Sequence, residues 1–195
     1  MRKTTPDIHI PELLAPAGNF DKLVTAIHYG ADAVYLGGER YSLRARAGNF
    51  TRTEMKKAVA YAHNHHVKVY ATVNIFAHNR DLDDLDDYLH FLQTTGIDAL
   101  IIADPGIFHI ARTIVPDLPI HLSTQANVTN FAAAEFWKEQ GARRLNLARE
   151  LGLAEIRAIR QQSDIELEIF VHGALCISYS GRCMLSNYFT GRDAN

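Results

Sequence analysis

The two cysteines of the chain, Cys176 and Cys183, are the residues whose type and spacing most clearly indicate chemistry. They follow a short alternating apolar run, 167–171, which is typical of a strand and which His172 and Gly173 interrupt. Six residues separate the two thiols, and the glycine and serines around them are not the composition of a buried core. This pattern favours thiol chemistry or a metal site over two buried small apolar side chains.

Several kinds of cysteine site can be compared with this spacing. A zinc knuckle is not indicated, because two residues usually separate its paired cysteines. Iron–sulfur clusters are usually held by four thiolates, of which Cys176 and Cys183 would supply two. A peptidase nucleophile would need a base and an oxyanion hole; His172 lies four residues before Cys176, and the backbone of 173–175 offers donors. No GxSxG elbow is present, and without an HExxH pattern a zinc peptidase is not supported either. For the two cysteines, the metal interpretation is therefore stronger than the peptidase one.

Two arginines, Arg44 and Arg46, alternate in the segment YSLRARAGNF at 41–50. In an extended segment, alternation places both guanidinium groups on the same side, which suits a carboxylate or a phosphate. The alternative is that both arginines are simply solvated.

The elements that must position these residues repeat along the chain. Gly30, Gly96 and Gly141 each follow a helical pattern and precede a short apolar run, as expected for glycine just past the end of a helix. The predicted strands are 13–15, 33–36, 68–74, 99–103, 120–123, 144–148 and 167–171. The predicted helices are 20–29, 53–65, 82–95, 106–115, 131–140 and 153–162.

Alternating helices and buried strands predict an α/β fold with a parallel sheet. Six βα units and a seventh strand indicate a (β/α)8 TIM-type barrel, of which an eighth unit is not present. A doubly wound open sheet is the alternative, although no dinucleotide-binding glycine pattern follows the first strand. We expect one domain over 1–195, belonging to a longer protein.

Polar residues stand where most of the predicted strands end, and in a barrel these ends form the active-site mouth. They are Asn74, Asp104, Gln125, Glu150 and His172. Glu12 lies near the start of the first strand, and His121 is predicted to pack or to form a hydrogen bond within its strand. The alternative interpretation is that strands often end on polar residues because loops begin there.

The composition is that of an ordinary globular protein, with 47% hydrophobic and 22% charged residues among 195 and a net charge of −2. The near-neutral charge argues against a general nucleic-acid binder, although a local basic patch remains compatible with it. The apolar runs are shorter than the ~20 residues of a membrane span, and few cysteines fit a reducing compartment, so we expect a cytoplasmic protein without a membrane partner.

The segment HGALCISYSGRCMLSNYFTGRDAN at 172–195 resembles the signature of the peptidase U32 family of collagenase-like proteins. The likeness extends to ELLAPAGNFDKLVTAIHYGADAVYLGG, RYSLRARAGNF, VNIFAHN, ADPGIF, IHLSTQANVTN and LARELGLAEI, and so covers nearly the whole chain. It implies an RNA-modifying enzyme that hydroxylates the wobble uridine of tRNA to 5-hydroxyuridine, with prephenate as the oxygen source and a [4Fe–4S] cluster.

The same resemblance implies roles for individual residues. Cys176 and Cys183 would be cluster ligands, completed by further cysteines beyond this chain, and Arg44 and Arg46 would hold the carboxylates of the co-substrate. Among the strand-end residues, the catalytic candidates are Glu150, Gln125 and His172, and the substrate-binding candidates are Asn74 and Asp104.

Two rival functions stay open at the level of sequence. One is a collagenase-like peptidase that uses Cys176 or an unassigned metal. The other is a non-catalytic barrel that docks RNA or substrate for a redox partner. The sequence does not distinguish prephenate from another small acid, and it gives no oligomeric state or tRNA contact surface.

Overall fold

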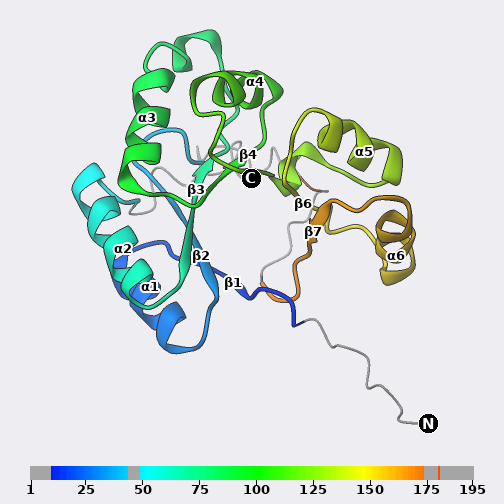
Figure 1. The fold of residues 1–195 in the computed structure, drawn as a ribbon, viewed down its shortest axis with the longest axis horizontal. Helices are drawn as coiled ribbons and strands as arrows, with labels where there is room; N and C mark the ends of the chain where they lie inside the picture. Colours follow the sequence, from blue (N-terminus) through cyan, green and yellow to red (C-terminus); the bar gives the residue numbers. More distant parts are fainter. Residues whose placement is uncertain (1–9, 44–48, 174–179, 181–195) are drawn as a thin grey trace, which may run out of the picture.

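The computed structural model describes residues 10–43, 49–173 and 180 of the chain. Seven parallel strands form one sheet in the sequential order β1 to β7, and the sheet curls with helices along its outer side (Figure 1). The strands are β1 Leu14–Pro16, β2 Ala33–Gly37, β3 Lys68–Val73, β4 Ala99–Ile102, β5 Ile120–Leu122, β6 Arg144–Asn146 and β7 Glu166–Glu168. The α-helices are α1 Phe20–His28, α2 Arg52–Asn64, α3 Leu85–Thr95, α4 Pro105–Ile114, α5 Phe131–Glu139 and α6 Leu153–Gln162, and the 3₁₀ helices are η1 Asn79–Asp81 and η2 Thr124–Ala126.

Each strand sends alternate side chains to opposite faces of the sheet. The convex face carries most of the apolar core, in which side chains such as Leu36, Leu100 and Leu145 pack among those of the helices. The concave face has a small apolar cluster around Tyr70 and Ile101, and much of the rest of it is polar. This division makes the inside of the curled sheet the place to look for chemistry.

Local signals in the sequence explain where the helices begin and end. The side chains of Asn19, Asp104 and Asn130 accept hydrogen bonds from the first turns of α1, α4 and α5. Gly30, Gly96 and Gly141 adopt φ values of 88°, 88° and 96°, the left-handed conformation predicted for them.

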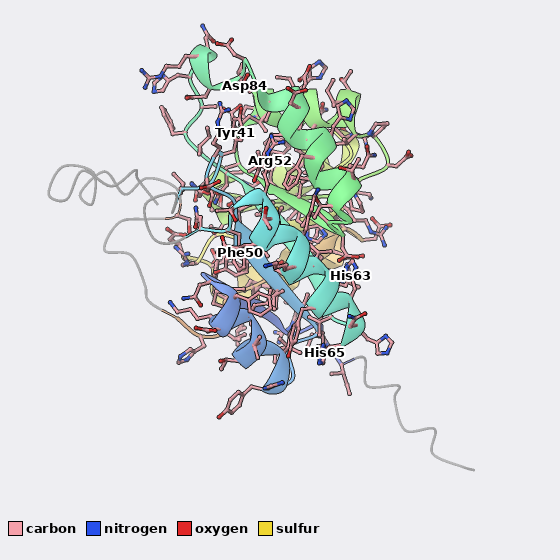
Figure 2. All side chains as sticks on the ribbon, turned by 90° about the vertical axis from the view of Figure 1, so that its left-hand side faces the viewer. Tyr41, Phe50, Arg52, His63, His65 and Asp84 are labelled. Atoms are coloured by element: carbon pink, nitrogen blue, oxygen red, sulfur yellow. The ribbon has the colours of Figure 1, made fainter. Side chains whose placement is uncertain are left out.

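Two histidines lie at the end of α2, where the helix dipole favours them. His63 lies in the last turn and His65 is the C-cap (Figure 2). His63 Nε2 lies 2.8 Å from Asp98 Oδ2, and the same carboxylate oxygen accepts a hydrogen bond from Val69 N. These contacts tie α2 to the start of β3 through Asp98 and give His63 a structural role.

The barrel-type prediction is confirmed, because neighbouring strands follow one another without the reversal of order that a doubly wound sheet requires. Most element bounds differ from the predicted ones by one or two residues, and two differ by three. β7 covers Glu166–Glu168 instead of 167–171, and Ile169, Phe170 and Val171 are exposed beyond it. Helix α3 begins at Leu85 instead of Leu82, because residues 79–81 form a separate 3₁₀ turn.

Candidate functional site

Two predicted mouth residues, Asn74 and Gln125, are in direct contact at the carboxyl end of the sheet. Asn74 Nδ2 donates a hydrogen bond of 2.7 Å to Gln125 Oε1, and Ser123 Oγ donates one of 3.1 Å to the same oxygen. Two donors therefore occupy Gln125 Oε1, and this fixes the orientation of its amide. Among the described residues no partner is found for the Nε2 group of Gln125, which can donate to an acceptor at the mouth.

Two glycines allow close packing at the end of β2 and in the loop that follows it. A Cβ at Gly37 would lie 2.4 Å from Ser42 Oγ, and one at Gly38 would lie 2.3 Å from the Tyr88 hydroxyl. Thr72 Oγ1 donates to the carbonyl of Leu36 at 3.2 Å and lies 3.0 Å from Ser42 Oγ. The tight packing holds residues 37–43 against β3, directly before Arg44 in the sequence.

Glu150 holds Ser180. Its carboxylate accepts a short hydrogen bond from Ser180 N, and Ser180 Oγ accepts one of 3.1 Å from Arg149 N. Burial is the largest single influence and opposes ionisation of Glu150, but the hydrogen bonds to the backbone and side chain of Ser180 and the Arg149 charge together outweigh it and lower the pKa of the carboxyl. Thr124 Oγ1 lies 3.4 Å from Ser180 Oγ, so the loops after β5 and β6 both anchor this serine. Ser180 stands between the two cysteines in the sequence.

Asp104 and His172, the other predicted site residues that the structure describes, are not brought into this cluster. Asp104 uses its carboxylate to cap α4, where it accepts a hydrogen bond of 2.9 Å from Ile107 N. His172 is exposed after β7. Arg44, Arg46, Cys176 and Cys183 lie outside the described residues, so their predicted roles stay predictions.

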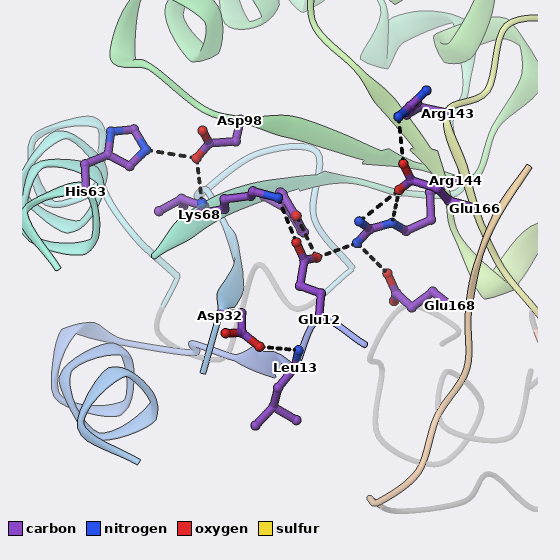
Figure 3. Close-up of polar contacts among 12 residues, drawn as sticks. Glu12, Leu13, Asp32, His63, Lys68, Asp98, Arg143, Arg144, Glu166 and Glu168 are labelled. Atoms are coloured by element: carbon purple, nitrogen blue, oxygen red, sulfur yellow. Dashed lines mark hydrogen bonds and ion pairs between the residues drawn. The ribbon is translucent and has the colours of Figure 1, made fainter. Parts of the chain in front are cut away.

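A second polar cluster surrounds Arg144 on the concave side, where Lys68, Arg144 and Glu166 begin β3, β6 and β7 (Figure 3). Arg144 Nη1 lies 2.6 Å from Glu12 Oε1, and its Nη2 lies 3.0 Å from Glu166 Oε2. Lys68 and Tyr70 also donate to the Glu12 carboxylate, at 2.9 and 2.7 Å. Because β3 and β6 are not neighbours in the sheet, these side chains can meet only across its concave side.

The cluster fixes the charge state of Glu12 and His121. Burial disfavours ionised Glu12, yet hydrogen bonds from Arg144, Lys68 and Tyr70 outweigh it and lower the pKa of Glu12 to about 2. His121 is 5% exposed and packs edge-on against the Tyr70 ring at 4.7 Å. Burial, with the nearby Arg144 charge, lowers the pKa of His121 to about 3, so the imidazole is neutral.

Glu168 is the residue in this cluster best suited to exchange a proton. Asn146 Nδ2 donates a hydrogen bond of 2.7 Å to Glu168 Oε1, and Arg144 Nη1 lies 3.7 Å from Glu168 Oε2. Burial raises the pKa of Glu168 to about 6, because the Arg144 charge compensates only part of the lost hydration. A carboxyl group with this pKa can take or give a proton near neutral pH.

Sequence reasoning missed Arg144, Asn146 and Glu168. The available signal was the polar alternation within RLN at 144–146 and ELE at 166–168, where one apolar residue faces the helices and two polar residues face inward. Short strands of three residues made that pattern hard to distinguish from loop composition.

Comparison with known proteins places the chain in a family. The model of peptidase family U32 matches residues 18–195. The chain belongs to this family. It is 51% identical over 185 residues to tRNA hydroxylation protein P1 of Bacillus subtilis, which covers 95% of this chain and 44% of that protein. It is 48% identical over 186 residues to tRNA hydroxylation protein P of Escherichia coli, covering 95% and 41% of the two chains.

Two further proteins resemble this chain over most of its length. The 23S rRNA 5-hydroxycytidine C2501 synthase of Escherichia coli is 39% identical over 191 residues, covering 98% of this chain and 29% of that protein. The structure of the U32 peptidase Mk0906 superposes with a TM-score of 0.71 at 17% identity, over 87% of this chain and 72% of that one, and supports the fold alone. The chain spans less than half the length of these three curated relatives.

None of the helices in 10–43 and 49–173 has the length and apolar character needed to cross a membrane. Within the same ranges, no group of three or more His, Cys, Asp or Glu residues is arranged to hold a metal ion.

Proposed function

We propose that the protein containing this chain hydroxylates the wobble uridine of tRNA to 5-hydroxyuridine. The observation that carries the proposal is the identity of about 50% over 95% of the chain to two tRNA hydroxylation proteins. The relative named for 5-hydroxycytidine in rRNA supports the same type of reaction, on a pyrimidine of RNA.

The geometry of the concave face supports specific roles. Gln125, whose Oε1 is occupied by Asn74 and Ser123, offers its Nε2 hydrogens to a carbonyl oxygen such as those of uracil. Replacement of the hydrogen on C5 by a hydroxyl group requires that a proton leave C5, and Glu168 is a carboxylate that can accept it. Asn146 orients Glu168 through the 2.7 Å hydrogen bond.

The proposed cofactor is a [4Fe–4S] cluster, which supplies one-electron chemistry when bound. The donor chemistry of Cys176 and Cys183 fits such a cluster, but the chain has two cysteines and the cluster needs two more thiolates from outside it. Ser180, which lies between the two cysteines in the sequence, is bound by Glu150 and Arg149 beside the mouth. The proposed oxygen source is prephenate, whose two carboxylates Arg44 and Arg46 would hold.

The test is the modified-nucleoside profile of tRNA from a strain that lacks the gene, grown without oxygen to suppress any oxygen-dependent route. We expect 5-hydroxyuridine derivatives to disappear and to return when the intact gene is restored. An unchanged profile in the deletion strain would reject tRNA hydroxylation as the function.

A further inference from the structure

The loop from Asn74 to His78, between β3 and η1, turns an aromatic side chain into solvent. Its residues alternate: Ile75 and Ala77 pack against the core, while Phe76 is 80% exposed. The Phe76 ring meets the His78 ring edge-on at 5.7 Å and an interplanar angle of 75°. A single exposed aromatic residue is common on protein surfaces, so the surroundings of Phe76 decide whether it has a function.

The loop is fixed at both ends. Asn74 N donates a hydrogen bond of 2.8 Å to the Tyr41 carbonyl, and the Asn74 side chain donates to Gln125. At the other end, His78 N donates to Asp81 Oδ2 at 2.8 Å, and Asp81 N donates to the His78 carbonyl at 2.8 Å. The backbone that carries Phe76 is therefore braced on both sides, and the ring faces solvent.

A cation and a hollow accompany the aromatic ring. The Arg80 side chain is 83% exposed, and its Nε lies 4.0 Å from Asp81 Oδ1, a loose contact that leaves the guanidinium group accessible. His78, Asn79 and Arg80 line an open hollow of about 390 Å³. Three aspartates lie in η1 and the turn after it. Asp81 caps the turn, and Asp84 pairs with Arg40 at 2.7 Å. Within the described residues, the third, Asp83, has no ion pair.

The position of the loop links it to the mouth. Phe76 follows Asn74 by two residues, and Asn74 contacts Gln125, the proposed carbonyl-binding residue. A flat ring with a nearby guanidinium group is suited to single-stranded RNA, because any base can stack on the ring while the cation meets a phosphate. A protein partner would be expected to cover a larger continuous apolar surface than one ring.

We propose that Phe76, His78 and Arg80 form a platform on which a nucleotide next to the modified one stacks, so that the loop holds the RNA while its target base enters the mouth. This inference rests on the proposed function and extends it to a contact surface.

The test measures binding of an unmodified anticodon stem-loop RNA to the intact protein by fluorescence anisotropy. We expect Phe76→Ala to weaken binding about 10- to 100-fold, the range for loss of a stacked base. Phe76→Trp should retain binding, and Phe76→Leu should not restore it, since leucine is apolar but cannot stack. Arg80→Gln should reduce the salt dependence of binding, because a phosphate contact is lost.

The matched control is Tyr29→Ala. Tyr29 is also exposed, at 86%, but it caps the end of α1 before β2. It therefore lies near the amino ends of the strands, away from the mouth at their carboxyl ends. Thermal unfolding of each variant should match that of the wild type, since both rings are exposed.

Three results would overturn the platform. They are wild-type affinity in Phe76→Ala, full recovery in Phe76→Leu, or an equal loss in Tyr29→Ala. If the platform fails while the deletion strain still loses 5-hydroxyuridine, the proposed function stands without it. If the wild-type protein does not bind the RNA and the tRNA profile is unchanged, both proposals fail.

Discussion

Glu168 differs from Glu12 in how far nearby donors and cations offset the cost of burying its negative charge. Glu12 contacts Arg144, Lys68 and Tyr70 at 2.6 to 2.9 Å, whereas Glu168 has one amide donor and an arginine at 3.7 Å. The pKa values of the two groups therefore move apart, to about 2 and about 6. Such a divergence between neighbouring acids is a common sign of an acid–base site.

Glu168→Gln should preserve the shape of the side chain and abolish its proton exchange. We expect hydroxylation to fall by about 100-fold or more, the usual contribution of a general base. Wild-type activity should rise with pH through about 6, as Glu168 loses its proton, and the variant should lack that rise. Initial rates between pH 5 and 8 measure both effects. Glu166→Gln, on the more exposed neighbouring carboxylate, is the control and should retain the rise.

Arg44 and Arg46 are predicted to hold the two carboxylates of the co-substrate. Replacing either by Ala should weaken prephenate-dependent hydroxylation, with a cost of roughly 1.5–3 kcal/mol for each lost charged contact. Arg→Lys should restore only part of the activity, because the planar guanidinium fork is lost. Titration of prephenate against the rate of hydroxylation measures the effect. Wild-type activity in the double Ala variant would rule out this role.

Cys176 and Cys183 are predicted to be iron ligands. The intact protein, purified without oxygen, should be brown, and Cys176→Ser or Cys183→Ser should lose the colour because a cluster ligand is removed. Iron per protein and visible absorption measure this. Unchanged iron content in both variants would show that these thiols do not hold the metal.

At the scale of elements, the order of strands and helices could be predicted because two local signals agree. Helix-ending glycines such as Gly96 stand shortly before buried apolar runs such as ALII at 99–102. The glycine reflects a backbone preference and the run reflects side-chain hydrophobicity, and both can be recognised without tertiary information. The end of β7 could not be predicted in this way. Ile169 and Val171 continue the apolar alternation of Leu167, but strand pairing with β6 stops at Glu168.

The candidate site was only partly predictable for a related reason. Strand ends identified Asn74 and Gln125, because carboxyl ends of parallel strands share one edge of the sheet. Asp104 obeyed the same rule and yet caps α4, since an aspartate before a helix satisfies backbone donors. The Glu12–Arg144 contact joins residues 132 positions apart, and only the curvature of the sheet brings them together.

His121 on β5 should make stability depend on pH. Its folded pKa of about 3 lies below its ordinary value of 6.5, so the unfolded chain binds the proton more readily. This contribution to stability is present above pH 6.5 and is lost as the pH falls from 6.5 toward 3. Between pH 7.5 and 5.5, we expect His121 to account for a loss of about 1.4 kcal/mol in the free energy of unfolding.

Urea unfolding of the wild type and of His121→Gln at the two pH values isolates this term. Glu168 acts in the opposite direction, because its raised pKa makes the folded state gain relative stability as the pH falls from about 6 to 4.5. Glu168 is present in both proteins, so its effect cancels in the comparison. His90→Gln, on the exposed side of α3, is the matched control and should behave like the wild type. An identical pH dependence in His121→Gln would contradict the assignment.

At the scale of the whole molecule, the family name and the names of the relatives point to different chemistries. The family is described as a peptidase family, whereas the relatives at about 50% identity are named for tRNA hydroxylation. A peptidase must bring a nucleophile or an activated water to an amide and stabilise the oxyanion that forms. The chain offers Cys176 as a nucleophile, and a thiolate committed to iron cannot also attack a carbonyl.

We therefore expect the intact protein to cleave gelatin or collagen peptides no faster than its Cys176→Ala variant. The same variant should fail to restore 5-hydroxyuridine derivatives in the tRNA of the deletion strain, because one proposed cluster ligand is missing. Peptide release measured against the variant, and nucleoside analysis of tRNA from the complemented strains, give the two readouts on one pair of proteins. Hydrolysis that is lost in Cys176→Ala, together with normal tRNA modification in the deletion strain, would instead establish Cys176 as a peptidase nucleophile.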